Sequence, residues 1–454
     1  MLKHQIDLGS ALRGGGTRRR TTLALLLTVT LGACSAPGSG STPDAGQASP
    51  TAVSTDVSGE QVELTLYDGA GLKAIDEALI EAFTAKHPNI TITGRYDPDD
   101  VQAQNAPRVL SSEDPPDIAR IIALSDVVQD GQLTNLDAYA EAYGWDQLPE
   151  GQLAQYRVSE DGVRGSGSQY AMADGFTVTG FYYNKQLAQQ LGMTTPPATV
   201  ADFEAVLAKA KAAGIVPIMA GNQTGQVVFA LQMMLNNTLG AEAVNDWVFH
   251  VPDASIGTPE AVQAVEKVAG WAEAGYFPAD TNGTDATAAA GRFARGEALF
   301  YVSGNWDAAT LDKSMAGNVG FMLPPTDEPG QAAAMSDPAS NFGIPVGSDD
   351  KDAAAAFLDF LRSPEARQVV VDAGFAPSGS GEIPQVTPGS ANAAVQEAFA
   401  RLVETDGQVQ FVQNATNGVT SVWNAEAQKL VAGQSDAARL LQAVQAQYED
   451  ELGR

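Results

Sequence analysis

Apolar and polar residues alternate, or recur at helical spacing, along most of this chain. Residues 62–70 alternate, which predicts a strand, and residues 90–97 predict a second one. Between them a helix is predicted, because apolar residues share one helical face before a proline: Leu72, Ile75, Leu79, Phe83 and Pro88. A short buried strand follows and ends at Arg120. This strand–helix–strand order predicts an α/β domain with a largely parallel sheet.

Later helices carry clear start signals. Thr199, Thr258 and Ser363 are good N-cap residues, and each directly precedes an amphipathic run. In two of these runs a proline occupies the first helical position, where its missing N–H is tolerated. Residues 437–452 predict the last helix. Helices therefore dominate the chain, with short strands between them.

The first 33 residues follow another pattern. A basic cluster, TRRRTT, precedes about eleven mostly apolar residues, LALLLTVTLGA, whereas a membrane-spanning helix needs about 20. The basic flank and the short apolar run are typical of a secretory signal peptide. The following LGAC, which ends at Cys34, resembles the lipobox of bacterial lipoproteins. That resemblance implies lipidation of the Cys34 sulfur and cleavage before it. The alternative is a reduced, buried cysteine that follows an apolar run by chance.

Residues 34–60 are rich in Ser, Gly, Pro, Ala and Thr and nearly lack large apolar residues. This composition predicts a flexible linker, so we expect folding to begin near Gln61. Cys34 is the only cysteine of the chain, so no internal disulfide is expected. A lipid on Cys34 implies an exported protein, anchored to the outer face of the bacterial cytoplasmic membrane through its lipid alone.

Charge and histidine spacing narrow the possible partners. The formal net charge is −29, and five of the basic residues lie before Cys34. This acidic balance argues against nucleic acid or an anionic lipid surface as the main partner. The three histidines, His4, His87 and His250, are far apart and lack metal-ligand spacing. We therefore expect neither a metal nor a cofactor.

One stretch suits the recognition of a sugar. An apolar strand ends in GNWD at residues 304–307, where small residues would let a ligand approach the backbone and Trp306 offers a flat apolar face. A sugar ring has one apolar face and a rim of hydroxyls, which aromatic and planar polar side chains match. The alternative is a tryptophan packed into the core at the end of a strand.

Several motifs occur in a recognisable order. The most specific are GFYYNKQLAQQLGMTTPPATVADFEAVL and RFARGEALFYVSGNW, and they stand with LTLYDGAG, PPDIARI and GFAPSGSG. In their order along the chain they resemble the extracellular solute-binding proteins of bacterial ABC importers, in the family of maltose-type sugar binders. The resemblance covers most of residues 61–454. It implies a periplasmic-binding-protein-like α/β fold, with two discontinuous lobes, a hinge, and a ligand cleft between the lobes that closes on binding.

The resemblance also implies a division of the chain. We expect a signal peptide at 1–33, a lipid-anchored linker at 34–60, lobe 1 at 61–173 plus 318–362, and lobe 2 at 174–317 plus 363–454. The chain is expected to cross between the lobes near residues 172–176, 319–325 and 362–368.

Positions within the matching motifs imply ten contacts to the solute. They are Tyr67, Asp68, Arg120, Asp174, Phe176, Asn222, Asn305, Trp306, Asn341 and Trp423. Trp306 is the expected stacking platform. For Trp423 the alternative is packing under the last helices. Tyr67 stands where many relatives have tryptophan, so the resemblance does not name the sugar.

The implied function is that of a binding protein and not of an enzyme. It would capture a mono- or oligosaccharide and deliver it to the membrane permease of an ABC importer, and we expect a monomer. Two alternatives remain open. The same fold would bind a polyamine or another cationic solute if Asp68, Asp174 and Asp307 converge. A lipid-anchored glycoside hydrolase needs two suitably spaced carboxylates, and the many acidic residues offer chance pairs.

Overall fold

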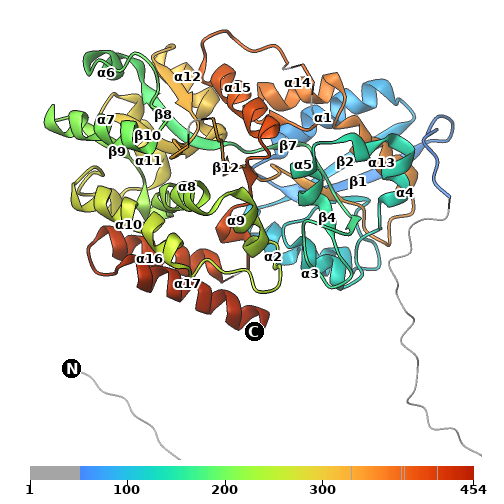
Figure 1. The fold of residues 1–454 in the computed structure, drawn as a ribbon. Helices are drawn as coiled ribbons and strands as arrows, with labels where there is room; N and C mark the ends of the chain where they lie inside the picture. The colour runs from blue at the N-terminus through green and yellow to red at the C-terminus, as the bar shows by residue number, and fades with distance from the viewer. Residues whose placement is uncertain (1–51, 329, 380, 383, 417, 454) are drawn as a thin grey trace, which may run out of the picture. The chain divides into compact units, whose positions relative to one another are not determined.

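The computed structural model describes residues 52–453, apart from residues 329, 380, 383 and 417. The predicted signal peptide, Cys34 and most of the predicted linker lie outside the described residues. Two α/β lobes are present, each built around its own sheet (Figure 1). Lobe 1 is the part around a five-stranded sheet, and lobe 2 is the part around a four-stranded sheet. The predicted two-lobed architecture is confirmed.

The sheet of lobe 1 has the strand order β2-β1-β3-β13-β6. The strands are β1 (Val62–Gly69), β2 (Ile90–Asp97), β3 (Ile118–Arg120), β6 (Met172–Ala173) and β13 (Asn341–Gly343). β1 runs parallel to β2 and β3, as the local pattern predicted, whereas β13 runs antiparallel to β3 and β6. The carboxyl ends of β1, β2 and β3 therefore meet at one edge of the sheet.

Helices cover both faces of this sheet. They are α1 (Lys73–Lys86), α2 (Asp99–Leu110), α3 (Leu124–Gln129), α4 (Asp137–Tyr143), η1 (Trp145–Gln147), α5 (Glu150–Tyr156), α13 (Lys351–Phe360) and α14 (Pro364–Asp372). α1 buries the predicted face: its Phe83 ring lies 5.3 Å from the Phe357 ring and 5.5 Å from the Phe360 ring of α13. A small hairpin of β4 (Arg157–Val158) and β5 (Ser168–Gln169) follows α5.

The sheet of lobe 2 has the order β11-β8-β10-β9. The strands are β8 (Thr179–Asn184), β9 (Val216–Met219), β10 (Ala298–Gly304) and β11 (Val319–Met322). The sheet is mixed and not largely parallel, because β8 runs antiparallel to both β10 and β11. Only β9 and β10 pair in parallel among its described strands.

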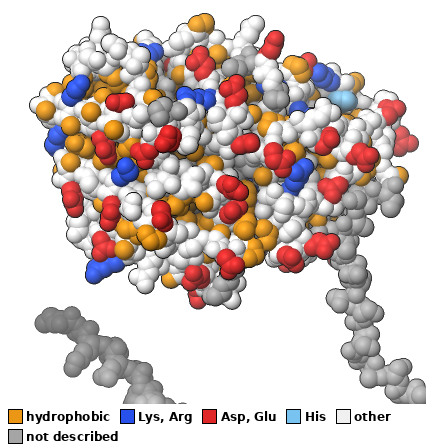
Figure 2. All heavy atoms as spheres, in the orientation of Figure 1, with side chains coloured by type: hydrophobic (Ala, Val, Ile, Leu, Met, Phe, Trp, Pro, Cys, Tyr) orange, Lys and Arg blue, Asp and Glu red, His pale blue; other side chains and the backbone are white. Residues whose placement is uncertain are grey.

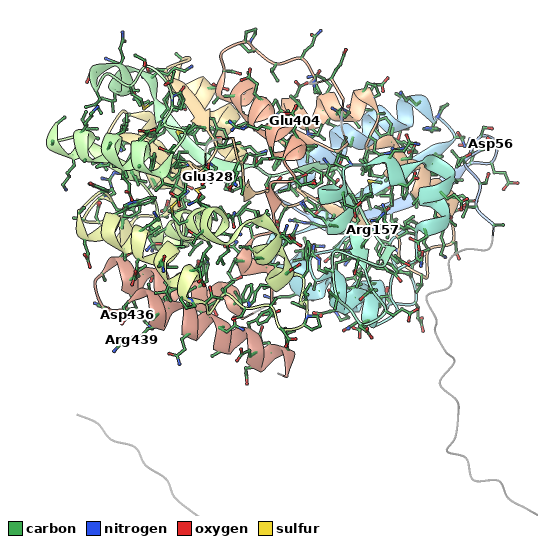
Figure 3. All side chains as sticks on the ribbon, viewed as in Figure 1. Asp56, Arg157, Glu328, Glu404, Asp436 and Arg439 are labelled. Carbon is green, nitrogen blue, oxygen red and sulfur yellow. The ribbon has the colours of Figure 1, made fainter. Side chains whose placement is uncertain are left out.

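Lobe 2 holds most of the described helices. They are α6 (Lys185–Gln190), α7 (Val200–Ala212), η2 (Asn222–Thr224), α8 (Val227–Leu239), α9 (Ala241–Val248), α10 (Pro259–Glu273), η3 (Thr281–Gly283), α11 (Ala286–Ala294), η4 (Asn305–Asp307), α12 (Ala308–Met315), α15 (Ala391–Glu404), η5 (Val412–Asn414), α16 (Val419–Val431) and α17 (Ala437–Leu452). The predicted caps are confirmed, since the hydroxyls of Thr199, Thr258 and Ser363 each accept a backbone N–H of the following helix. Asp436 caps α17 in the same way by accepting from the Arg439 N–H (Figure 3).

Two of the predicted crossings lie too early in the chain. β11 pairs with β8 in lobe 2, so residues 319–322 do not begin lobe 1. α14 packs on α1 of lobe 1, and Glu365 forms an ion pair with Lys86 at 2.7 Å, so residues 364–372 do not begin the last part of lobe 2. Both assignments depend on partners far away in the sequence, which a local pattern does not show.

Two short strand pairs lie next to the crossings between the lobes. β7 (Gly175–Phe176) pairs with β14 (Ala376–Pro377), and β12 (Ala334–Met335) pairs with β15 (Gln408–Val409). The second crossing therefore lies between β12 and β13, and the third follows β14. In Figure 1, β7 and β12 appear between the two lobes.

The packed chain begins earlier than predicted. Val53 and Val57 are partly buried against the core of lobe 1. The Asn89 side-chain amide donates to the backbone oxygens of Val57 at 2.8 Å and Glu60 at 3.1 Å. The predicted linker boundary at residue 60 is therefore too late. Residues 52–60 are mostly small or polar, so their composition gave no sign of this packing.

The described residues contain no helix that is both long and apolar enough to cross a membrane. On the face shown in Figure 2, acidic side chains are widely spread and more abundant than basic ones. This agrees with the strongly negative net charge of the sequence.

Candidate functional site

The carboxyl edge of the lobe 1 sheet brings three of the predicted residues together. Asp68 lies near the end of β1, Arg120 ends β3, and Asp174 follows β6. One Asp68 oxygen accepts from Arg120 Nη1 at 3.3 Å, and the other accepts from the Ser340 hydroxyl at 2.6 Å. The Ser340 backbone N–H donates to Asp174 at 2.8 Å. Ser340 thus joins Asp68 to Asp174, both fully buried, at the edge where open α/β sheets bind ligands.

A third carboxyl group, which sequence reasoning missed, lies beside this pair. Asp76, in the first turn of α1, is fully buried, and neither of its oxygens accepts from an N–H or hydroxyl group of the described residues; its carboxyl group lies within hydrogen-bonding reach of the Asp68 carboxyl group. Burial raises its pKa well above the ordinary value, and the nearby Asp68 and Asp174 raise it further. A visible signal existed in the sequence, because Asp76 falls on the apolar stripe of α1 between Leu72 and Leu79.

Arg120 is the one guanidinium in contact with these carboxyl groups among the described residues. Burial raises the pKa of Asp174 to about 7 and also raises the pKa of Asp68, although Arg120 lowers both. Three buried carboxyl groups cannot all ionise beside one cation, so the cluster of Asp68, Asp76 and Asp174 holds protons near neutral pH.

Tyr67 in β1 and Asn341 in β13 belong to the same sheet, and both are buried. The Tyr67 hydroxyl donates to Asp97 at 2.8 Å, and the Arg95 guanidinium lies 4.8 Å from the centre of its ring. Burial, followed by the hydrogen bond to Asp97, raises the Tyr67 pKa to about 12. The Asn341 backbone oxygen accepts from Ile121 N, and its side-chain oxygen has no donor among the described residues. Their contact with a solute stays a prediction.

The edge of lobe 2 carries the exposed aromatic ring. Trp306, in η4 directly after β10, has 37% of its surface exposed, and its ring meets the Phe229 ring edge-on at 5.9 Å. Gly304 permits this position of the ring, since a Cβ on it would clash with the indole. The Asp307 carboxyl group is hydrogen-bonded within lobe 2, where the Tyr301 and Ser303 hydroxyls donate to it at 2.8 and 2.6 Å.

The predicted amides of lobe 2 serve as internal ties. Asn305 is fully buried, donates to the Phe176 oxygen at 3.1 Å, and accepts from Val178 N at 3.1 Å. It therefore fixes η4 to the first crossing segment. Asn222 is also fully buried and donates to the Asn282 side chain at 2.6 Å. Neither amide side chain is exposed in this conformation.

Two predicted aromatic residues lie in the cores. Phe176 is fully buried and stacks on Phe399 with ring centres 5.6 Å apart. Trp423, in α16, is fully buried in the core of lobe 2. For Trp423 the structure thus matches the alternative given above, packing under the last helices.

A cavity of about 480 Å³ opens between the lobes. Its lobe 1 side comes from the loop and helix after β3 and from Arg164, and its lobe 2 side comes from α9, the segment after β15, and α17. Lining residues include Ile122, Asp126, Gln413, Asn414 and Thr420. Sequence reasoning missed them because they belong to no motif. Ile122, 47% exposed just after the end of β3, is the one with a visible signal.

Trp306, Phe229 and Phe411 form a row of aromatic rings that do not themselves line the cavity. The Phe411 ring lies 5.8 Å from the Phe229 ring, which contacts Trp306, and Gln413 follows two residues after Phe411. The volume of the cavity falls within the ~300–1,000 Å³ of small-molecule sites. Among the described residues, no group of three or more His, Cys, Asp or Glu side chains is arranged to hold a metal.

Solved structures share this fold. A chitin oligosaccharide binding protein matches with a TM-score of 0.69 and 20% identity, covering 87% of this chain and all of that one. The bacterial solute receptor AcbH, with a preference for β-D-galactopyranose, matches with a TM-score of 0.70 and 17% identity over 87% of this chain and 99% of its own. Maltose-bound MalE3 of T. maritima matches with a TM-score of 0.64 and 18% identity over 86% of this chain and all of its own. The predicted periplasmic-binding-protein-like fold is confirmed.

Sequence comparison identifies the family. A "Probable sugar-binding periplasmic protein" of Mesorhizobium japonicum is 28% identical over 233 residues, which are 50% of this chain and 52% of that protein. The match thus spans about half the length of this curated relative. The family model of the bacterial extracellular solute-binding protein matches residues 69–368. This chain therefore belongs to the family of bacterial extracellular solute-binding proteins.

Proposed function

We propose that this protein captures a mono- or oligosaccharide between its lobes and delivers it to the membrane permease of an ABC importer. The observation that carries the proposal is the exposed Trp306 at the carboxyl end of β10, whose ring contacts Phe229 and, through it, Phe411, two residues before Gln413 of the cavity wall. An exposed indole offers the apolar face that a sugar ring stacks on. The sugar ligands of the related proteins support the same class of solute.

The two lobes supply complementary surfaces for such a solute. Ile122 and Trp306 are two of the four large hydrophobic residues that the described chain exposes, and each lies two residues after the end of a central strand, one in each lobe. Polar side chains of the cavity wall, among them Gln413 and Asn414, can donate to and accept from hydroxyl groups. This mixture suits a neutral polyol better than an apolar solute.

The cationic alternative has less support. Asp68 and Asp174 do converge, but both are fully buried and Asp68 already pairs with Arg120. Asp307, the third acid of that hypothesis, accepts hydrogen bonds from two hydroxyl groups of lobe 2. Since this leaves no exposed set of converging carboxylates at these three positions, a neutral sugar is favoured over a polyamine. The family is one of binding proteins, which favours binding over the hydrolase alternative.

A thermal-shift screen of the purified protein tests the proposal. A panel of mono- and oligosaccharides, with spermidine included, is tested at low and high salt. A bound sugar should raise the melting temperature, because it binds the folded state only, and the shift should change little with salt. A salt-sensitive shift with spermidine and none with any saccharide would support the cationic solute instead.

We also infer export, lipid anchoring through Cys34, and action as a monomer beside the permease. The motif at residues 31–34 supports the anchor, and the family supports the exported location. Expression of Cys34→Ala in a lipoprotein-processing host tests it. The variant should lose incorporation of labelled fatty acid and processing at this site. Unchanged labelling and processing would contradict the anchor without affecting the sugar proposal.

A further inference from the structure

One loop of lobe 1 reaches across to lobe 2. Residues 159–167 connect β4 to β5, and the Arg164 N–H of this loop donates to the Phe249 oxygen, at the end of α9, at 3.0 Å. The Arg164 guanidinium also lies 4.9 Å from the centre of the Phe249 ring. The next residue, Gly165, has φ +87° and would place a Cβ 2.9 Å from that ring. The loop is therefore fitted closely to lobe 2.

The Arg164 side chain is 9% exposed and binds both lobes. Its Nη2 donates to the Gln155 backbone oxygen at 3.4 Å and to the Gln410 side-chain oxygen at 3.1 Å. The Gln410 amide in turn donates to the Gln155 side chain at 2.6 Å. Gln155 belongs to α5 of lobe 1, whereas Gln410 follows β15 of lobe 2. A buried guanidinium thus closes a hydrogen-bonded ring that links the two lobes.

The neighbouring carboxylate holds the same segment of lobe 2. Asp337 accepts from Phe411 N at 3.0 Å and from the Asn414 side-chain amide at 2.5 Å. Burial raises the Asp337 pKa to about 6, whereas the charge of Arg164 opposes that rise. Arg164 therefore favours the ionised carboxylate, which is the stronger acceptor for these two donors.

We propose that Arg164 is a positioning residue of the solute site. From lobe 1 it holds residues 410–414 of lobe 2 in place, directly through Gln410 and indirectly by keeping Asp337 charged. Gln413 and Asn414 of this segment line the interlobe cavity, as Arg164 itself does. That the wall touches the solute rests on the proposed function, but the positioning does not.

Hydrogen exchange measured by mass spectrometry, on the purified full chain without solute, tests this directly. Protection of residues 408–416, corrected for the intrinsic exchange rate, is followed from pH 5 to pH 8, with α10 as an internal reference. At pH 7, Arg164→Ala should lower the protection of this segment by about tenfold or more and leave α10 unchanged. On acidification, the variant should also lose the protection of this segment at a higher pH than the parent does. Without the Arg164 charge the Asp337 pKa rises, so Asp337 is protonated, and becomes a weaker acceptor, at a higher pH.

Further variants separate the direct effect of Arg164 through Gln410 from its indirect effect through Asp337. Arg164→Lys keeps the charge but lacks the planar fork, so it should restore the pH midpoint without restoring full protection. Gln410→Ala should lower the protection without moving the midpoint. His250, whose Nε2 lies 2.6 Å from the Ala415 oxygen, is kept in every variant. Arg157→Ala, at the base of the same hairpin (Figure 3), removes only an ion pair with exposed Glu150 and should change neither quantity.

Unchanged protection of residues 408–416 in both Arg164→Ala and Gln410→Ala would overturn the proposal. An equal loss in α10 would also overturn it, since the effect would then be one of global stability. Because no solute is present, the outcome stands whether or not the protein binds a sugar.

Discussion

The carboxyl edge of the lobe 1 sheet and the Trp306 edge of lobe 2 are built from opposite chemistry. The lobe 1 edge buries three carboxyl groups, Asp68, Asp76 and Asp174, around one contacting guanidinium. The lobe 2 edge has satisfied amides and hydroxyls and leaves one large ring, Trp306, exposed. The comparison teaches that the titratable groups of lobe 1 are buried beneath its edge, whereas lobe 2 exposes an apolar ring at its edge. Stability and its pH dependence should therefore reside in lobe 1, and solute affinity should depend most on lobe 2.

The largest effect is expected from Asp174→Asn. The folded pKa of Asp174, about 7, lies above the ordinary 3.8, so its contribution to stability is full below about pH 4 and is lost as the pH rises through 7. Asparagine cannot ionise, and its oxygen can still accept from Gly175 N and Ser340 N. The free energy of unfolding of the variant, relative to the parent, should therefore rise between pH 4 and 7, by up to ~1.4 kcal/mol per pH unit.

Urea denaturation at several pH values measures this difference. Asp307→Asn is the matched variant on lobe 2, where the two hydroxyl donors oppose the effect of burial on the carboxyl group. It should show a weaker pH dependence than Asp174→Asn. A flat difference for Asp174→Asn would break the contrast between the two edges.

Arg120→Ala should come next. It leaves the buried Asp68 without its cation, and breaking a buried ion pair costs about 3 kcal/mol or somewhat more. The loss should be greatest above pH 7 and should shrink on acidification, because protonated carboxyl groups no longer need the cation. Arg157→Ala, which removes an exposed pair, should cost less than about 1 kcal/mol. Equal losses in the two variants, measured by urea denaturation, would contradict the assigned role of Arg120.

Asn305→Ala should have a smaller and pH-independent effect. The variant leaves the buried Phe176 oxygen and Val178 N–H without their side-chain partner, which costs about 2 kcal/mol. Thermal melts at pH 5 and pH 8 should show the same loss. A loss that varies strongly with pH would mean that the lobe 2 edge also depends on buried charge.

Trp306→Ala should affect stability least. Its ring is partly exposed and contacts Phe229 edge-on, so we expect a loss below about 1.5 kcal/mol in urea denaturation. A larger loss would indicate that the indole is a core residue, as Trp423 is. The contrast with its effect on solute affinity is what separates a binding surface from a structural one.

Local patterns predicted much of the fold. The stripe of α1 and the caps at Thr199, Thr258 and Ser363 depend on residues a few positions apart, so the sequence displays them. The sequence could not show to which lobe β11 and α14 belong. The position of β11 depends on its pairing with β8, and that of α14 depends on its packing on α1.

The candidate site shows the same limit. Asp68, Asp174 and Arg120 were found through motifs at strand ends, and Asp76 could have been found as an acid on an apolar stripe. The contact between Arg164 and Gln410 joins residues 246 positions apart, and no local signal marks it. The sequence left core packing open for both Trp306 and Trp423, and burial decides between the two residues.

Isothermal titration calorimetry with the saccharide that gives the largest thermal shift tests the central claim most directly. The parent, Trp306→Ala and Val346→Ala are compared; Val346 is also an exposed hydrophobic residue, at 49%, but follows β13 at the opposite edge of the lobe 1 sheet. The account predicts one bound sugar per chain, an affinity at least about tenfold weaker in Trp306→Ala, and no change in Val346→Ala. Full affinity in Trp306→Ala, or an equal loss in both variants, would contradict it.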